Sequence, residues 1–372
     1  MMFLSPRSPG LRAAKNPGPM TWASSESSAS RRTMDSGSRA VRASGQRGFV
    51  FALLLALLAA TPALAQDEPR RPVHTFSIVA RDAETGQLGV AVQSHWFSVG
   101  SMVSWAEPGV GVVATQSLVD PSYGPQSLYL LRQGRSPEQT LAALIAADPH
   151  PQGRQVAMVD ARGRVAAYTG EGSIREFCHI TGAGYSVQAN LMGPATICEA
   201  MSRAYEAAEG DLAARLMAAL HAAQAEGGDI RGQQSAVLLV VSGDASQPSW
   251  GGRVFDLRVE DHRRPLQEMD RLLALARAYN EMNAGDAALT ANDMAGARAH
   301  YAAAMRLAPD NHEMVFWTAA TLAAAGDVDA SLPLFRRAFR MHPPWRELVQ
   351  RLPASGLMPD DPALMQRILA VR

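Results

Sequence analysis

The sequence predicts an α+β protein: a four-layer αββα sandwich of two antiparallel sheets, followed by an all-α domain. Apolar residues alternate in blocks of short strands, and a pair of helical segments separates each block from the next. Beyond about Pro265 the chain becomes alanine-rich and matches itself at an offset of 34 residues. Strand blocks and helix pairs in this order differ from the strand-helix alternation of a parallel doubly wound sheet.

Alternating apolar residues predict four consecutive short strands at the start of the sandwich. We expect them at about 75–81, 87–94, 100–105 and 110–116. Glycines between and within these segments suit hairpin turns and a close approach of neighbouring backbones.

Two helices are predicted next, over about 123–133 and 136–147. The second has a clear start, because Ser136 suits the N-cap, Pro137 the first turn and Gln139 a capping box.

The remainder of the sandwich repeats this order of strands and then helices. A hairpin over 154–160 and 164–169 and a strand over 185–189 precede helices over 195–209 and 212–226. The apolar run over 235–241 predicts a buried strand, and 253–260 alternates as its partner.

The alanine-rich end of the chain contains an internal repeat. Residues 34 positions apart match in type, namely Asp293 with Asp327, Tyr301 with Phe335, Ala304 with Ala338, Arg306 with Arg340 and Pro309 with Pro343. This period and pattern are typical of tetratricopeptide repeats. Helices over 266–282 and 361–371 would cover the apolar faces that the repeats leave open.

Composition excludes several classes of function. The 372 residues carry 35 basic and 35 acidic side chains, and this balance offers no electrostatic footprint for nucleic acid. The nine histidines are scattered without metal-ligand spacing, and no phosphate loop or dinucleotide motif occurs. We therefore expect no metal, no cofactor and no nucleic-acid partner.

The beginning of the chain resembles an export signal. Arginines precede the apolar run at 49–60, and Ala63-Leu64-Ala65 suits signal peptidase, so cleavage is expected before Gln66. The run is short for a spanning helix, although an uncleaved membrane anchor is the alternative. Residues 1–33 are interpreted as a start-site artefact or an extension.

The predicted organisation is a leader and signal over 1–65, a linker over 66–74, the sandwich over 75–262 and helical repeats over 263–372. We expect an exported protein, periplasmic or extracellular, without a stable membrane span after cleavage. In such a compartment its two cysteines, Cys178 and Cys198, either form a bridge or remain buried thiols.

A sandwich of this kind is the arrangement of N-terminal-nucleophile hydrolases, whose first strand begins with a catalytic Thr, Ser or Cys. Here that residue is Thr75. At a free amino terminus, its hydroxyl would be the nucleophile and its own α-amino group the base.

Four segments together resemble the domain of unknown function 1028 family. They are TFSIVA at 75–80, GVAVQS at 89–94, GVGVVATQ at 109–116 and GDIRGQQS at 228–235. The resemblance covers roughly residues 75–260 and implies a fold similar to N-terminal-nucleophile hydrolases, without a settled activity. In members that lack a leader, loss of the initiator Met would expose the threonine directly.

In this chain a second cut, at the His74–Thr75 bond, is needed before amino-terminal chemistry. The only lysine is Lys15, in the leader, so a lysine-assisted site is excluded. His95, after the second strand, and Arg231, before the buried strand, are the candidates to replace it. His95 is otherwise an ordinary histidine at the edge of the core.

Other polar residues stand near predicted strand ends. Asp82 is a candidate, although turn chemistry explains it equally well. Asn190, Gln116 and Ser117 could supply oxyanion donors or could cap the ladder. A polar cluster lies directly before the predicted buried strand, and it is either a structural ion pair or one wall of a site. Its members are Asp229, Arg231, Gln234 and Ser235.

Two hypotheses follow. The first is an exported amidohydrolase in which Thr75 attacks a small amide or peptide. The second is a non-enzymatic envelope protein that binds a ligand and contacts a protein partner through its repeats. A homodimer is compatible with either hypothesis.

Overall fold

The computed structural model describes Val73, residues 75–248 and residues 250–372. The predicted leader over 1–65, and the linker over 66–74 apart from Val73, lie outside the described residues.

The larger sheet has six antiparallel strands. In spatial order they are β10 (Arg253–Val259), β9 (Ser235–Val241), β2 (Leu88–Ser94), β1 (Thr75–Arg81), β8 (Tyr185–Ala189) and β7 (Cys178–Gly182). The first strand of the sandwich is therefore central, because it pairs with β2 on one side and β8 on the other.

The smaller sheet has four antiparallel strands. In spatial order they are β3 (Ser104–Glu107), β4 (Gly111–Ser117), β5 (Arg154–Asp160) and β6 (Val165–Thr169). Each neighbouring pair is adjacent in sequence, so this sheet is a meander interrupted by helices α3 (Tyr123–Arg132) and α4 (Pro137–Ala147) between β4 and β5.

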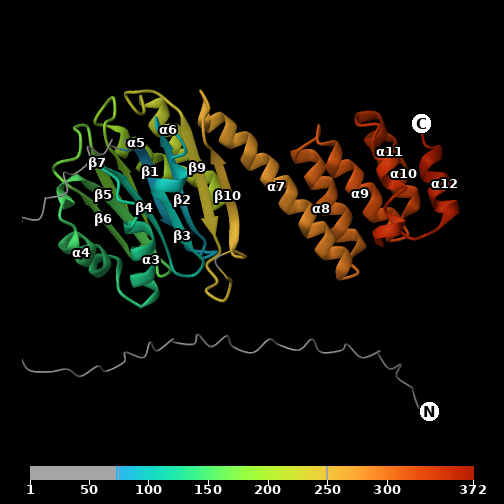
Figure 1. Ribbon diagram of the computed structural model, residues 1–372, viewed down its shortest axis with the longest axis horizontal. Helices are drawn as coiled ribbons and strands as arrows, with labels where there is room; N and C mark the ends of the chain where they lie inside the picture. Colours follow the sequence, from blue (N-terminus) through green and yellow to red (C-terminus); the bar gives the residue numbers. More distant parts are fainter. Residues whose placement is uncertain (1–72, 74, 249) are drawn as a thin grey trace, which may run out of the picture. The chain divides into compact units, whose positions relative to one another are not determined.

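The sheets pack face to face, and helices cover their outer faces (Figure 1). Val79 of β1 and Val159 of β5 share the core between the sheets. Ile78, on the opposite face of β1, packs under helices α5 (Ile197–Ala207) and α6 (Leu212–Ala225). α3 and α4 cover the smaller sheet.

Close helix packing explains one glycine of the second strand. A Cβ on Gly89 would lie 2.6 Å from the Leu216 Cδ1 atom of α6. A side chain at this position would force the Leu216 side chain to shift.

The strand predicted over 100–105 is wrong in its first half. Gly100–Val103 form the short helix α2, and β3 begins only at Ser104. Before α2, the Val99 backbone N–H donates to the Ser235 hydroxyl at 3.2 Å. Directly after α2, the Ser104 hydroxyl donates to the Gly100 carbonyl at 2.8 Å. These side-chain hydrogen bonds stabilise a helical turn where the apolar pattern indicates a strand.

Strand β7 was not predicted, and it settles the state of the cysteines. It is an edge strand with no fully buried residue. A strand in such a place needs no regular apolar pattern, and its sequence, CHITG, shows none. Its first residue, Cys178, forms a disulfide with Cys198 of α5, whose Cα atom lies 6.1 Å away. The bridge, rather than buried free thiols, is what the structure contains.

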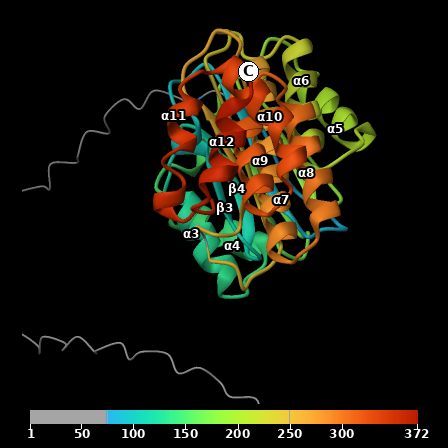
Figure 2. The ribbon, with the colours of Figure 1, turned by 90° about the vertical axis from the view of Figure 1, so that its right-hand side faces the viewer.

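A helical region follows, from α7 (Pro265–Thr290) to α12 (Pro362–Ala370) (Figure 2). α7 is longer than the predicted 266–282. Between these helices lie α8 (Met294–Leu307), α9 (His312–Ala324), α10 (Val328–Met341) and α11 (Trp345–Val349). The bounds of α8 and α10 differ by 34 residues at both ends, which matches the repeat in the sequence.

Two antiparallel sheets, covering helices and a helical carboxyl-terminal region are thus confirmed. Among the described residues, no helix combines the length and apolar character needed to cross a membrane.

Candidate functional site

Thr75 is the first residue of β1 and lies in a row of hydroxyl groups across the larger sheet. It pairs with Ser94 of β2, and Ser94 pairs with Ser235 of β9. All three residues are buried. Because directly paired side chains lie on the same face, the register places three hydroxyls side by side at one end of the sheet.

The chain crosses from one sheet to the other immediately before Thr75. Val73 makes an isolated antiparallel bridge with Ser117, the last residue of β4 in the smaller sheet. Its N–H donates to the Ser117 carbonyl at 2.7 Å, and its carbonyl accepts from the Ser117 N–H at 3.0 Å. Val73 and Thr75 both have 0% exposure, so the Thr75 hydroxyl is covered in this state.

The contacts of Thr75 are with neutral groups. Its Oγ1 lies 3.1 Å from the Val73 carbonyl oxygen and 3.2 Å from the Ser94 hydroxyl. A hydroxyl has one hydrogen to donate, so when Thr75 donates to Val73, the Ser94 hydroxyl can donate to Thr75. The carbonyl of Thr75 accepts from the Gln116 side-chain amide and the Asn190 N–H, each at 3.2 Å.

A buried network of amides and hydroxyls supports this position from between the sheets. Gln155 of β5 is its centre, since its Oε1 accepts from Gln116 at 2.7 Å and from the Asn190 side chain at 2.8 Å. The Ser77 hydroxyl donates to Gln116 Oε1 at 2.7 Å and accepts from the Gln188 amide at 2.6 Å. The network fixes the amides that hold the Thr75 carbonyl.

The sequence reasoning identified Gln116 and Asn190 but missed Ser77, Gln155 and Gln188. A partial signal was present, because Ser77 shares a strand face with Val79, and Gln155 shares one with Ala157 and Val159. Gln188 gave none, since its strand alternates polar and apolar residues as a strand with one exposed face does. Polar side chains buried at such positions must find hydrogen-bond partners, and here they find one another.

A loop contact connects His95 with Arg231, and His95 directly follows Ser94 of the hydroxyl row in the sequence. The His95 backbone N–H donates to the buried carboxylate of Asp229 at 3.1 Å. The same carboxylate binds the Arg231 guanidinium, with Nη2 to Oδ2 at 2.7 Å and Nε to Oδ1 at 3.0 Å. The ion pair therefore connects the loop before β9 to the end of β2.

Asp82 lies at the opposite end of β1 from Thr75. Its carboxylate accepts from the Glu84 and Thr85 N–H groups at 3.1 and 2.7 Å, and Arg215 lies 3.4 Å away. Burial alone would raise the pKa of this carboxyl, but these hydrogen bonds and Arg215 outweigh it and hold the pKa below its usual value. The structure does not bring Asp82 to Thr75.

The other polar candidates have structural contacts. Ser117 has a backbone φ of 71°, and its hydroxyl donates to Ser173 at 3.2 Å. A positive φ is unfavourable for a non-glycine residue and is maintained only by its surroundings. The Ser235 hydroxyl caps the turn before α2, and Gln234 donates to Asp261 at 3.2 Å.

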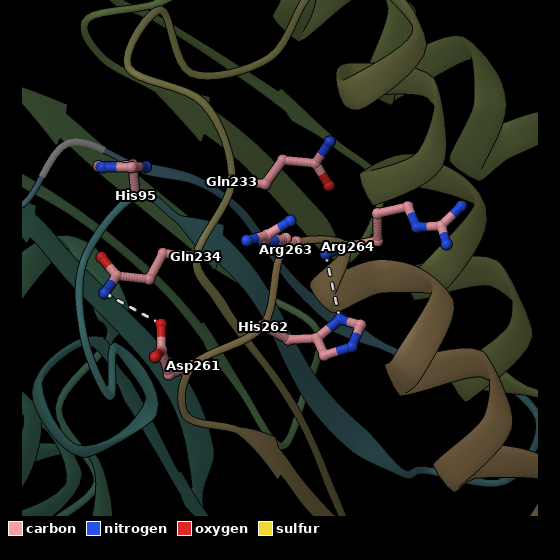
Figure 3. Close-up of a pocket in the computed structure, with 7 residues that line it drawn as sticks. All are labelled: His95, Gln233, Gln234, Asp261, His262, Arg263 and Arg264. Carbon is pink, nitrogen blue, oxygen red and sulfur yellow. Dashed lines mark hydrogen bonds between the residues drawn. The ribbon is translucent and has the colours of Figure 1, made fainter.

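A polar pocket of about 590 Å³ opens beside the ends of β2 and β9 (Figure 3). Its lining residues are His95, Gln233, Gln234, Asp261, His262, Arg263 and Arg264. Within the described part of the chain, neither arginine has an ion-pair partner, and the buried Nδ1 of His95 has no hydrogen-bond partner. The pocket suits a polar ligand with hydrogen-bond acceptors.

No group of three or more His, Cys, Asp or Glu side chains that could hold a metal ion occurs among the described residues.

Comparison with known proteins places this chain in a family. The model of a family of unknown function, DUF1028, matches residues 75–269, just over half of the chain. A crystal structure of a protein from Silicibacter pomeroyi, assigned to the same family, is 31% identical with a TM-score of 0.49. That match covers 54% of this chain and 84% of the other. No curated protein matches. The chain therefore belongs to the DUF1028 family.

Proposed function

We propose that this protein is an exported amidohydrolase of the N-terminal-nucleophile type, with Thr75 as its nucleophile. One observation carries the proposal. Thr75 begins a central strand at the point where the chain crosses between the sheets, with its Oγ1 3.2 Å from the Ser94 hydroxyl and 3.1 Å from the Val73 carbonyl oxygen. The stacking of helices and sheets is compatible with this fold type.

The first step is a cut of the chain itself. The Thr75 hydroxyl attacks the carbonyl carbon of the preceding residue, its proton passes to the amide nitrogen, and the amide becomes an ester. Water then hydrolyses the ester: its OH joins the acyl carbon, and its remaining hydrogen restores the hydroxyl. The cut frees the α-amino group of Thr75.

Turnover of a substrate repeats this chemistry on an external amide. The α-amine accepts the hydroxyl proton while Oγ1 attacks the substrate carbonyl, and the proton then passes to the leaving amine. Water releases the acyl group as a carboxylic acid. In place of the missing lysine, Ser94 is the neutral hydrogen-bond partner of the nucleophile.

Removal of the residues before Thr75 is also required for access. The Thr75 side chain has 0% exposure while Val73 is bonded to β4. An external substrate can therefore reach Oγ1 only after the Val73 backbone has left Ser117. The cut before Thr75 therefore frees its α-amino group and also allows the residues that cover its hydroxyl to leave.

Export is supported by the Cys178–Cys198 disulfide, because such bonds persist in oxidising compartments.

The mature amino terminus is the decisive measurement. Intact mass and amino-terminal sequencing of the purified protein are expected to show a chain that begins at Thr75. Thr75→Ala should keep the preceding residues, whereas Thr75→Ser, which retains a hydroxyl, should still be cut. A mature wild-type chain that begins at Gln66, with unchanged hydrolysis of amides by Thr75→Ala, would overturn the proposal.

A second function is favoured by the helical region. The helices α8 and α10 have Asp293 and Asp327 at their N-caps, and they bury Tyr301 and Phe335 at equivalent places. We propose that these are tetratricopeptide-like repeats that contact a protein partner. The exposed Tyr279 would contribute. Pull-down with the full chain should recover a partner that Tyr279→Ala recovers less well, and equal recovery would count against this surface.

A further inference from the structure

The bridge between Val73 and Ser117 has the geometry of a peptide added to the end of a strand. Both backbone hydrogen bonds of an antiparallel pair are present, at 2.7 and 3.0 Å. Such bonds use only the N–H and C=O groups of the guest, so any residue in an extended conformation can make them. Ser117 therefore offers one complete backbone binding position beyond β4.

The side-chain position at this bridge is apolar and closed. Val73 has 0% exposure and belongs to the core between the sheets, together with Val92, Val99 and Val119. A polar or charged side chain there would lose its contact with water without a partner. The position is thus selective for a small or medium apolar side chain.

Contacts that do not involve Val73 hold the backbone of Ser117 in place. Its hydroxyl bonds to Ser173, and its strand pairs in register with Arg154 of β5. The Arg154 guanidinium donates to the Leu118 carbonyl and to Asp148, at 2.6 Å for Nε to Oδ2. These contacts hold the strand end, so the binding position does not depend on Val73 for its backbone geometry.

We propose that the end of β4 at Ser117 is a substrate subsite that takes one extended apolar residue of a peptide-like substrate. Val73 fills it in the uncut chain. Val73 is the second residue before Thr75, so a substrate residue held here would be the second one before the amide bond that Thr75 attacks. The substrate class rests on the proposed hydrolase function, whereas the binding position itself does not.

The test uses the full chain with Thr75→Ala, which cannot cut itself, alone and combined with Val73→Asp. The aspartate carboxylate is expelled from the apolar core and leaves the subsite free. The probe is a fluorescent peptide with the sequence of residues 71–74, Arg-Pro-Val-His, whose binding is followed by fluorescence anisotropy. Two matched peptides carry N-methyl-valine, which lacks the donor to Ser117, or serine in place of valine.

We expect the parent peptide to bind the double variant about tenfold or more tightly than the Thr75→Ala chain, in which Val73 competes. The N-methyl peptide should bind the double variant about tenfold more weakly than the parent peptide does, because it lacks one backbone hydrogen bond. A tenfold factor corresponds to about 1.4 kcal/mol of binding free energy. The serine peptide should lose a similar factor.

Equal binding of the three peptides, or equal binding by the two chains, would overturn the subsite. Circular dichroism shows whether Val73→Asp folds, and Val73→Gly replaces it if it does not. Absence of binding by a folded variant also overturns the subsite. A wild-type chain that remains uncut while the peptides bind as expected would instead refute the hydrolase and leave the binding site standing.

Discussion

At the scale of single residues, the site is defined by neutral oxygen and nitrogen atoms. The Thr75 hydroxyl has Ser94 and the Val73 carbonyl as partners, and its own carbonyl is held by Gln116 and Asn190. A hydroxyl among such groups remains protonated and weakly nucleophilic. The free α-amine that a cut at Thr75 creates is therefore the base that the proposed chemistry requires.

Asp82 is predicted to have no part in this chemistry. Replacement of Asp82 with Ala removes the acceptor for two backbone N–H groups in the turn after β1 and should cost about 1 kcal/mol of unfolding free energy. The amino terminus of the mature protein should not change. Denaturant unfolding and intact mass test both parts, and loss of the cut in a stably folded Asp82→Ala chain would contradict them.

The buried ion pair of Asp148 with Arg154 predicts a response to acid. Both side chains are only 4% exposed, and the pair lies beside the strand end at Ser117. Burial alone would raise the pKa of Asp148, but hydrogen bonds from Arg154, the His150 N–H and Tyr123 outweigh it and lower the pKa. A carboxyl with a lowered folded pKa stabilises the fold above its unfolded pKa, and this contribution is lost as pH falls through the folded pKa.

We therefore expect the wild-type unfolding free energy to fall as the pH decreases below about 4. Asp148→Asn should cost about 3 kcal/mol at pH 7, because it leaves a buried guanidinium without its anion, and should show a smaller loss in acid. Urea unfolding at pH 7, 5, 4 and 3 measures this. Glu107→Gln, in the more exposed pair with Arg132, is the control and should cost less than about 1 kcal/mol. Equal costs for both substitutions would contradict the prediction.

At the scale of elements, β7 shows how a strand without an apolar pattern is held in a sheet. Among the described strands it pairs with β8 alone, at the edge of the sheet, and its residues are at most half-buried. The Cys178–Cys198 disulfide adds a covalent connection to α5, which packs on the sheet. The bridge therefore ties the outermost strand to the helical layer.

Removal of this bridge should destabilise the protein by about 3 kcal/mol, since the disulfide closes a loop of about 20 residues. The double substitution Cys178→Ser with Cys198→Ser is compared with the wild type in guanidinium unfolding and in amide hydrogen exchange. Faster exchange should be confined to β7 and its neighbour β8. The wild type treated with reductant serves as a control for the substitutions themselves, and an unchanged unfolding midpoint would show that the bridge carries no stability.

The sequence predicted most elements because their apolar residues repeat with the period of a strand or a helix. Two further local signals, the capping box at Ser136 and the 34-residue offset of α8 and α10, were also read from the sequence. It failed where tertiary contacts decide the structure. α2 depends on Ser235, which is distant in sequence, and β7 depends on pairing with β8.

At the scale of the whole molecule, the candidate site could be predicted only in part. Thr75, Gln116 and Asn190 stand at predicted strand ends. The pairing of β1 with β8 brings Asn190 to Thr75, whereas Gln116 reaches Thr75 from the facing sheet. Ser77 and Gln188 are register partners within the larger sheet, but they meet Gln116 and Gln155 only because the two sheets face each other, and a single strand pattern cannot show such a contact. The crossing of the chain from Val73, which pairs with the smaller sheet, to Thr75 in the larger sheet is likewise a property of the assembled sheets.

α7 connects the sandwich to the helical region as one continuous helix. Its first turns, with Leu266, Met269 and Leu273, pack in the core beneath the larger sheet. Its later turns, with Ala278 and Met282, pack in a core with α8 and α9. The family match ends at residue 269, inside this helix, and the division predicted between 262 and 263 remains a prediction. Because one helix packs in both cores, disruption of this helix should allow the two cores to unfold independently of each other.

Ala274 stands between these two parts of α7 and belongs to neither core. A proline there removes one backbone hydrogen bond and clashes with the preceding turn, at a cost of about 3 kcal/mol, whereas glycine costs about 1 kcal/mol. In calorimetry we expect Ala274→Pro to melt in two transitions, with the helical region first, while the wild type and Ala274→Gly melt in one. A single transition shifted down as a whole in Ala274→Pro would mean that contacts outside α7 couple the two cores.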